Sequence, residues 1–275
     1  MCGTLAADYQ LREEIGRGNF AKVYRCFSPS TGDFFACKTI KKSLVADRRF
    51  LEQEPKILML LAGAPNILRL FKVYEDEDSV HLITELCDGE DLYERVSRGP
   101  MPEPSAAKIF RQLMSAISCC HRAGISHRDV KLDNVLFDSA GNLKLADFGY
   151  AADFRGGRMS EFVGTPYYVA PEILMRREYD EKVDVWSAGV ILYMMLAGVP
   201  PFWGETTAET FKAVLRANLV FPTKLFRSIS PDAKDLLRKM ICKYPSKRLS
   251  ADEVLKHPWM INGGETEQKE SCLIC

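Results

Sequence analysis

The sequence lacks the features that direct proteins to nucleic acids, membranes or the secretory route. Its 37 Lys and Arg residues balance 37 Asp and Glu residues, so no charge excess favours nucleic acid or an anionic membrane as partner. The chain of 275 residues begins without the charged and then apolar pattern of a secretory signal. It has no uninterrupted apolar run of about 18 residues, so the sequence predicts no integral membrane segment.

Paired cysteines and calcium-binding loops are missing as well. The nine cysteines are scattered, odd in number and without CxxC spacing. This pattern favours neither a disulfide framework nor a zinc site, and it predicts a reducing, cytoplasmic location. No EF-hand loop of the form D-x-[DN]-x-[DN]-G with a glutamate at the twelfth position occurs in the sequence.

The pattern of the chain changes at about Leu86. Before it, β-branched and aromatic segments separated by Gly, Pro, Asn and Asp predict strands, with one helical segment between them. These strands are expected over 9–15, 21–27, 34–40, 67–75 and 79–86, and the helix over 48–62. After Leu86, apolar residues recur every three or four positions, which predicts helices. These are expected over 103–124, 181–198, 207–216, 230–240 and 251–257.

The sequence therefore predicts an α+β fold with two lobes. We expect a small β-rich lobe with one helix at 1–86, a larger helical lobe at 87–262, and a disordered tail at 263–275. Clefts between such lobes are favoured sites for ligands.

Two glycines, Gly16 and Gly18, lie between the first two predicted strands. Glycine lets backbone N–H groups approach phosphates closely, and a hairpin can fold over a nucleotide. The match to GxGxxG is imperfect because Ala21 replaces the third glycine. Taken alone, the segment is better explained as an ordinary hairpin turn.

Lys38 lies in the largely apolar strand FFACKTI. A single lysine in such a strand usually extends outward from the sheet edge. A role in phosphate binding requires a buried carboxylate to hold its ammonium group. The following helix offers Glu54, with Glu52 on another face as the weaker candidate. Pro55 is unusual there because it removes a helix hydrogen bond.

The most specific segment is SHRDVKLDNVLF, followed by KLADFG. Phosphoryl transfer needs a carboxylate facing the incoming hydroxyl, a cation near the transferred phosphate, and oxygen ligands for Mg²⁺. These groups are supplied by Asp129, Lys131, Asn134 and Asp147. Single Asp and Asn residues in loops are usually turn formers, but turn chemistry does not explain the ordered set HRDxKxxN, DFG and APE.

These motifs resemble those of eukaryotic protein kinases, and the resemblance covers residues 9–259. It implies the two-lobed protein kinase fold and the use of ATP and Mg²⁺. By this resemblance Lys38 would bind the α- and β-phosphates and pair with Glu54, and Asp129 would be the catalytic base.

Further roles follow from the same resemblance. Asn134 and Asp147 would hold Mg²⁺. Lys131, beside the base, and Thr165, in GTPYY, resemble the serine/threonine class, and Thr165 would lie on the substrate side. The nucleotide would contact Ile15, Gly16, Gly18, Phe20, Ala21, Val23, Ala36, Lys38, Glu85, Cys87 and Asp91.

Within this nucleotide site, backbone groups of Glu85 and Cys87 would meet adenine and Asp91 the ribose, with Thr84 behind them. Supporting roles are implied for an ion pair and a buried carboxylate in the large lobe. The ion pair is Glu172 with Arg248, and the carboxylate below the catalytic loop is Asp184.

Among kinases, the chain resembles the calcium/calmodulin-dependent group through GTPYYVAPE, DVWSAGVILYMMLAGVPPFWGE and HPW. Those relatives usually carry an autoinhibitory helix, a calmodulin-binding segment or EF-hands. Only a short tail follows Trp259 here, so we expect a monomer that acts without calcium or calmodulin.

The segments EPKIL, ELCDGEDLYERV and AVLRANLVFP closely resemble the plant phosphoenolpyruvate carboxylase kinases. This resemblance implies phosphorylation of a serine near the N-terminus of that carboxylase. Two alternatives stay open. One is a calcium-dependent-type kinase domain with other basic-motif substrates, and the other is a nucleotide-binding scaffold without catalysis.

Substrates of this group tend to carry a basic residue a few positions before the serine. Asp91 and Asp133 would receive such a cation. Plainer explanations are that Asp91 caps a helix and Asp133 forms a turn.

Glu161 lies four residues before Thr165, where many kinases carry an activating phosphate. Its carboxylate would pair with Arg128 of HRD and supply part of a phosphate's charge. A solvated surface glutamate explains the residue equally well, and Ser160 next to it leaves phosphorylation open.

The chain ends in SCLIC, a formal C-a-a-X box that would direct prenylation of Cys272 and a weak membrane association. A disordered tail with coincidental cysteines is the alternative, because the preceding GGETEQKE lacks a polybasic second signal.

Overall fold

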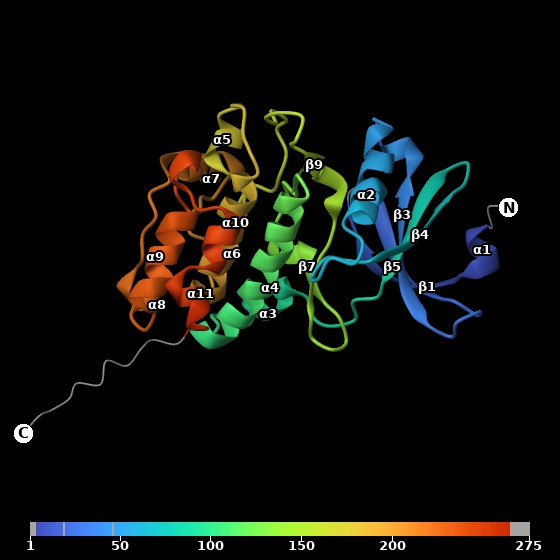
Figure 1. The fold of residues 1–275 in the computed structure, drawn as a ribbon, viewed down its shortest axis with the longest axis horizontal. Helices are drawn as coiled ribbons and strands as arrows, with labels where there is room; N and C mark the ends of the chain where they lie inside the picture. Colours follow the sequence, from blue (N-terminus) through green and yellow to red (C-terminus); the bar gives the residue numbers. More distant parts are fainter. Residues whose placement is uncertain (1–3, 19, 46, 265–275) are drawn as a thin grey trace, which may run out of the picture.

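The computed structural model describes residues 4–18, 20–45 and 47–264. A β-rich lobe lies at one end and a helical lobe at the other (Figure 1). The β-rich lobe contains α1 (Leu5–Asp8), β1 (Gln10–Arg17), β2 (Ala21–Phe27), β3 (Phe34–Lys41), α2 (Arg49–Leu60), β4 (Leu70–Glu75) and β5 (Ser79–Glu85). The structure confirms the predicted two-lobed α+β fold.

The five long strands form one antiparallel sheet in the order β1-β2-β3-β5-β4. Gly16 lies opposite Val23, Val23 opposite Lys38, and Ala36 opposite Thr84. Residues directly opposite each other, and residues two apart on one strand, share a face of the sheet. One face therefore carries these five positions together.

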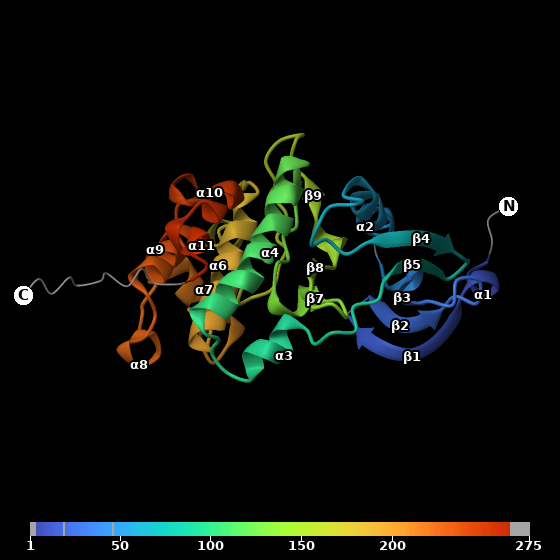
Figure 2. The same cartoon turned by 60° about the horizontal axis from the view of Figure 1, so that its bottom comes forward.

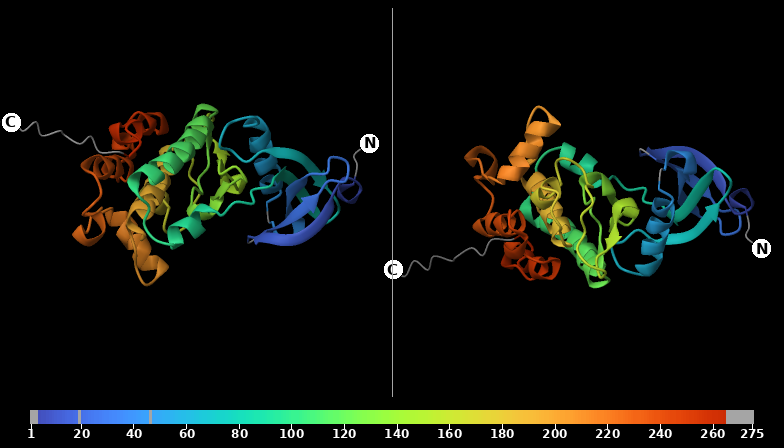
Figure 3. Two further views of the ribbon diagram at one scale, coloured as in Figure 1. Left: turned by 90° about the horizontal axis from the view of Figure 1, so that it is seen from below. Right: turned by 90° about the horizontal axis from the view of Figure 1, so that it is seen from above.

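The helical lobe follows β5. Its helices are α3 (Leu92–Ser97), α4 (Glu103–Arg122), α5 (Pro171–Leu174), α6 (Lys182–Ala197), α7 (Thr207–Arg216), α8 (Thr223–Phe226), α9 (Pro231–Met240), α10 (Ala251–Leu255) and α11 (Pro258–Ile261). Its strands are β6 (Ile125–Ser126), β7 (Val135–Phe137), β8 (Leu143–Leu145) and β9 (Ala152–Asp153). Figures 2 and 3 show that these short strands lie on the side of the lobe that faces the sheet.

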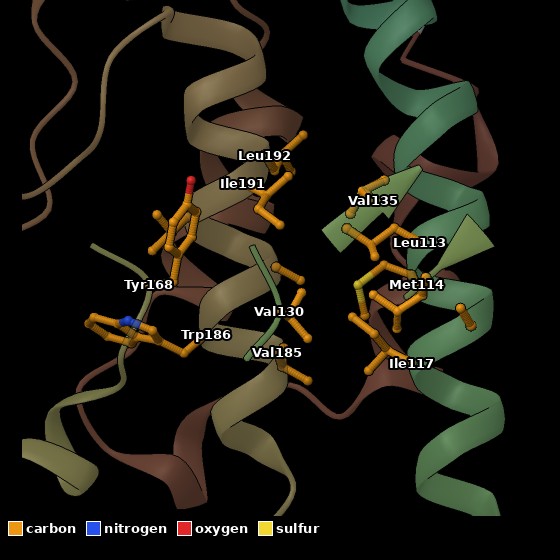
Figure 4. Close-up of a cluster of buried hydrophobic side chains, with 14 of the residues drawn as sticks. Leu113, Met114, Ile117, Val130, Val135, Tyr168, Val185, Trp186, Ile191 and Leu192 are labelled. Atoms are coloured by element: carbon orange, nitrogen blue, oxygen red, sulfur yellow. The ribbon is translucent and has the colours of Figure 1, made fainter. Parts of the chain in front are cut away.

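The core of the large lobe lies between α4 and α6. Leu113, Met114 and Ile117 of α4 point toward Ile191 and Leu192 of α6 (Figure 4). Only two residues of α6, Lys182 and Met194, are not fully buried, as its uniformly apolar sequence predicts. Helix α6 therefore forms a rigid base beneath the loops that precede and follow it.

The long elements agree with the sequence prediction to within a few residues. Helix α4 ends at Arg122, and Gly124 follows with a φ of 78°, a left-handed conformation that favours glycine and ends the helix. The short helices α3, α5, α8 and α11 were missed because four to six residues carry too little periodicity to detect.

Among the residues that the structure describes, no helix has both the length and the apolar character needed to span a bilayer. Gly264, near the start of the predicted tail, is buried and donates its N–H to the Trp259 carbonyl at 3.0 Å. Cys272 and its C-a-a-X box lie outside the described residues. The lobe boundaries at 86 and 262 stay predictions.

Candidate active site

Lys38 joins three elements that are distant in sequence. Its Nζ lies 2.7 Å from Glu54 Oε2 on α2 and 2.6 Å from Asp147 Oδ1, which follows β8. Glu54 is buried because it lies on the face of α2 that packs toward the sheet. Glu52 lies on the outer face and pairs with Lys56 at 2.6 Å, so Glu54 is the partner of Lys38, as expected.

The charges of Lys38 and Asp147 stabilise each other, whereas burial, together with the neighbouring Asp147 charge, raises the pKa of Glu54. Burial disfavours the charged ammonium of Lys38, but the carboxylates of Glu54 and Asp147 outweigh it and raise the pKa of Lys38. Burial acts against the charged form of Asp147 too, but Lys38 overrides it and lowers the pKa of Asp147. A permanent cation is thus held at the face of the sheet that carries Gly16 and Val23.

Helix α2 is also fixed to the segment that follows Asp147. The Gln53 side-chain amide donates to the Ala151 carbonyl, and the rings of Phe50 and Tyr150 meet edge to face at 6.3 Å. Pro55 is buried inside the helix and removes one of its backbone hydrogen bonds. The contacts of Gln53 and Phe50 hold the helix at this point from outside. The position of Glu54 therefore depends on this segment.

Asp129 lies in the catalytic loop between β6 and β7, where both of its carboxylate oxygens have partners. Thr165 Oγ1 donates to Oδ1 at 2.8 Å, and Lys131 Nζ lies 3.0 Å from Oδ2. The Asn134 side-chain amide donates to the Asp129 carbonyl at 2.9 Å, which fixes the backbone beside it. The carboxylate is thus oriented by one hydroxyl and one cation.

The loop that carries Asp129 is held from below by a buried carboxylate. Asp184 Oδ1 accepts the Arg128 N–H at 2.8 Å, and Oδ2 accepts the His127 N–H at 2.8 Å. Oδ2 also accepts from the Ser126 hydroxyl at 3.0 Å. Arg128 has a φ of 66°, a left-handed conformation that is uncommon for arginine and that these contacts help to hold.

A cation can bind at Asn134 and Asp147. Because the Asn134 amide nitrogen is used, its oxygen, which has no hydrogen-bond partner among the described residues, is available. Asp147 uses only one oxygen for Lys38. Carboxylate and amide oxygens suit Mg²⁺, which usually takes one or two protein ligands and completes its shell with water and phosphate oxygens. Accordingly, no cluster of three His, Cys, Asp or Glu side chains within the described ranges could hold a metal.

Three of the remaining predicted nucleotide positions lie on one face of the sheet. Gly16, Val23 and Ala36 share the Lys38 face of the sheet, as its register requires. Ile15 in β1 and Phe20 between β1 and β2 are exposed. Gly18 is exposed and Ala21 half-buried at the turn.

At the segment joining the lobes, the Glu85 carboxylate is used structurally. It accepts the Arg69 N–H at 2.7 Å and pairs with Lys144 at 2.8 Å. The Cys87 N–H and C=O have no backbone partner among the residues described, so both can meet the polar edge of a base. Asp91 caps α3 by accepting the Glu94 N–H at 2.8 Å. Asp133 is exposed.

The segment after β9 is held by Arg128. Its Nη1 donates to Glu161 Oε2 at 2.8 Å, so the predicted contact between these side chains is present. Burial acts against the charge of Glu161, but backbone N–H groups and Arg128 lower its pKa. The glutamate is therefore more than a solvated surface residue.

The buried ion pair of the large lobe is also present. Arg248 lies 2.7 Å from Glu172 Oε1 and also donates to the Cys242 and Lys182 carbonyls. It is fully buried, so the pair ties α5, which carries Glu172, to the C-terminal helices.

A model of the protein kinase domain matches residues 9–260. The chain belongs to the protein kinase family. It is 45% identical over 269 residues to calcium-dependent protein kinase 33 of Arabidopsis thaliana, a match that covers 95% of this chain and 51% of that protein. It is 44% identical over 264 residues to calcium-dependent protein kinase 8 of Oryza sativa subsp. japonica, covering 93% and 49%.

The chain thus spans about half the length of these relatives. It is a serine/threonine protein kinase domain related to the plant calcium-dependent protein kinases, which confirms the predicted group.

Two residues that support the site of this kinase were not predicted from the sequence. Tyr179 contacts Arg128 and Glu161 through its hydroxyl, and His121 Nε2 lies 2.9 Å from Asp184 Oδ2. Neither lies in a recognisable motif. For His121, the only feature of the sequence that could have indicated this contact was its place on the predicted helix, six residues before His127.

Proposed function

We propose that this kinase phosphorylates a serine near the N-terminus of phosphoenolpyruvate carboxylase and does so without calcium. The observation that carries the catalytic part is the placement of Asp129 between Lys131 and Thr165. The Lys38–Glu54–Asp147 cluster lies near enough for the charges of Asp147 and Lys131 to act on each other. The substrate rests on the resemblance of the segments EPKIL, ELCDGEDLYERV and AVLRANLVFP to the plant kinases of that carboxylase.

In the proposed mechanism, Asp129 accepts the proton of the substrate hydroxyl. Thr165 and Lys131 fix the carboxylate, and the Lys131 ammonium offsets negative charge that develops beside it. Lys38, held by Glu54, is the cation for the α- and β-phosphates, and Asn134 and Asp147 are the metal ligands. Bound ATP and Mg²⁺ supply the phosphoryl group and balance its charge.

Recognition of the substrate would use two acids on the large lobe. Asp133 lies four residues after the catalytic base and is exposed, so its carboxylate is free to receive a basic side chain. Asp91 serves as a helix cap and keeps one oxygen for the ribose or the substrate. This pair supports a basic residue before the phosphorylated serine.

Independence from calcium is supported by a contact in the loop that follows β9. Glu161 supplies a negative charge to Arg128 without modification, which favours an active conformation of the loop as synthesised.

The test compares two substrates with the purified chain and a calcium chelator. We expect transfer of phosphate to the carboxylase at a higher kcat/KM than to a generic serine peptide with a basic residue before the serine. The Asp129→Asn variant is the control and should transfer to neither. Equal or lower kcat/KM for the carboxylase would reject the substrate.

A second candidate is a kinase with other basic-motif substrates. It is favoured by the 45% identity to a calcium-dependent protein kinase. This candidate predicts transfer to the generic peptide without preference for the carboxylase. A chain that binds ATP and Mg²⁺ but phosphorylates neither substrate would instead be a scaffold.

A further inference from the structure

The contact between Arg128 and Glu161 is one side of a closed ring of three hydrogen bonds. Arg128 Nη1 donates to Glu161 Oε2 at 2.8 Å and to the Tyr179 hydroxyl at 3.2 Å. The Tyr179 hydroxyl in turn donates to the Glu161 carbonyl at 2.9 Å. Burial raises the pKa of Tyr179, so the hydroxyl keeps the proton that it donates.

The ionic side of this ring is exposed. The Glu161 side chain is 63% exposed, although Arg128 is only 5% exposed. Exposed ion pairs are weakened by solvent and salt, and many contribute little. Glu161 alone is therefore a weak means of holding the loop.

The Tyr179 side of the ring is buried. Its side chain is 2% exposed, and hydrogen bonds in such surroundings are screened by salt much less than an exposed ion pair is. Tyr179 also forms a backbone bridge with Met159, in which each N–H donates to the carbonyl of the other at 3.0 and 2.8 Å. Backbone and side chain of one residue thus hold both ends of the segment 159–161.

We propose that Tyr179 is the positioning residue that fixes the activation segment, residues 154–170 between β9 and α5, and that Glu161 depends on it. The Tyr179 hydroxyl orients the guanidinium of Arg128 and holds the Glu161 backbone, so that the exposed carboxylate meets its partner. This inference rests on the proposed function only for its kinetic readout.

Tyr179→Phe tests the proposal because it removes only the hydroxyl. The matched control is Tyr193→Phe, since Tyr193 is also 2% exposed and donates to a backbone carbonyl, that of Val220, at 3.1 Å. Tyr193→Phe loses one hydrogen bond of a buried tyrosine hydroxyl and Tyr179→Phe loses two, and only those of Tyr179 reach the catalytic loop and the activation segment.

With a generic basic serine peptide as substrate, we expect Tyr179→Phe to lower kcat about fivefold and to leave the KM for ATP unchanged within about twofold. Trypsin should cleave after Arg155 and Arg158 about fivefold faster than in the wild type, because the segment opens more often. In about 1 M salt this difference should grow, since only the screened ion pair remains. Tyr193→Phe should match the wild type in all three measurements.

A double-mutant cycle with Glu161→Gln separates a shared ring from two independent contacts. We expect the double variant to lose less activity than the product of the two single losses. Equal behaviour of Tyr179→Phe and Tyr193→Phe, or multiplicative losses in the cycle, would overturn the proposal. The trypsin measurement needs no activity, so it decides the question even if the wild type phosphorylates neither substrate.

Discussion

Asp184 and Glu161 both bind Arg128, but in opposite settings. Asp184 is 1% exposed and binds the Arg128 backbone N–H from within the core. Glu161 is 63% exposed and binds the guanidinium from the surface. Water cannot replace the first contact, whereas water and salt weaken the second. The catalytic loop is therefore built as a fixed part of the large lobe, and the activation segment is the part where activity can be adjusted.

The largest effect is expected at the buried carboxylate. Asp184→Ala leaves the N–H groups of Arg128 and His127 and the Ser126 hydroxyl without their acceptor. A buried donor without an acceptor costs about 1–3 kcal/mol, so the loss of three acceptor contacts should lower the free energy of unfolding by about 3 kcal/mol or more. Urea unfolding measures this loss. In the same measurement Glu161→Ala, which removes the exposed contact to Arg128, should lose less than about 1 kcal/mol. Similar losses in the two variants would contradict the comparison.

The same carboxylate should make the protein sensitive to acid. Burial acts to raise the pKa of Asp184, but the hydrogen bond from His121 and nearby charges outweigh it and lower the pKa below its usual 3.8. A lowered folded-state pKa means that the stabilisation is complete above the unfolded pKa and is lost as the pH falls through the folded pKa. The difference in unfolding free energy between wild type and Asp184→Asn should therefore shrink below about pH 4. A constant difference across that range would show that Asp184 does not titrate in this way.

A smaller effect is expected where the two regions meet. Thr165, from the activation segment, donates to Asp129 in the catalytic loop. Thr165→Ala removes a hydrogen bond to a charged group and should lower kcat about tenfold. Thr165→Ser keeps the hydroxyl and should recover most of the activity on the same peptide. Failure of serine to rescue would assign the loss to packing of the methyl group instead.

The smallest effect is expected at Glu161 itself. Glu161→Ala should lower kcat about threefold, because an exposed ion pair contributes at most about 1 kcal/mol. Phosphatase treatment of the wild type should leave its activity unchanged. Full activity in the variant, or inactivation by phosphatase, would show that the carboxylate does not stand in for a phosphate.

Local patterns explain what the sequence could predict. The resemblance to protein kinases implied the pairing of Lys38 with Glu54, and helical spacing separated Glu54 from Glu52. The contact of Arg128 with Glu161 followed from a fixed distance to Thr165 within one motif. Each of these inferences needed only short segments with a known motif, periodicity or spacing.

Contacts between distant segments could not be predicted in this way. Tyr179 lies 51 residues from Arg128, and His121 lies 63 residues from Asp184. Buried tyrosines are common, and nothing around Tyr179 marks its hydroxyl as a partner of the catalytic loop. Such contacts depend on how α6 places the loops, which is set by packing and not by a local pattern.

The register of the sheet restricts how the sequence can change in length. The register is continuous between β2 and β3 and between β3 and β5. This register places Val23, Ala36 and Lys38 on the face of the sheet that carries the site. Inserting or deleting one residue inside β3 would turn Lys38 to the opposite face and leave Glu54 without its partner. The turn at 28–33, between β2 and β3, lies outside this register. We therefore expect natural variation in length to collect in that turn and to be absent from the strands that flank it.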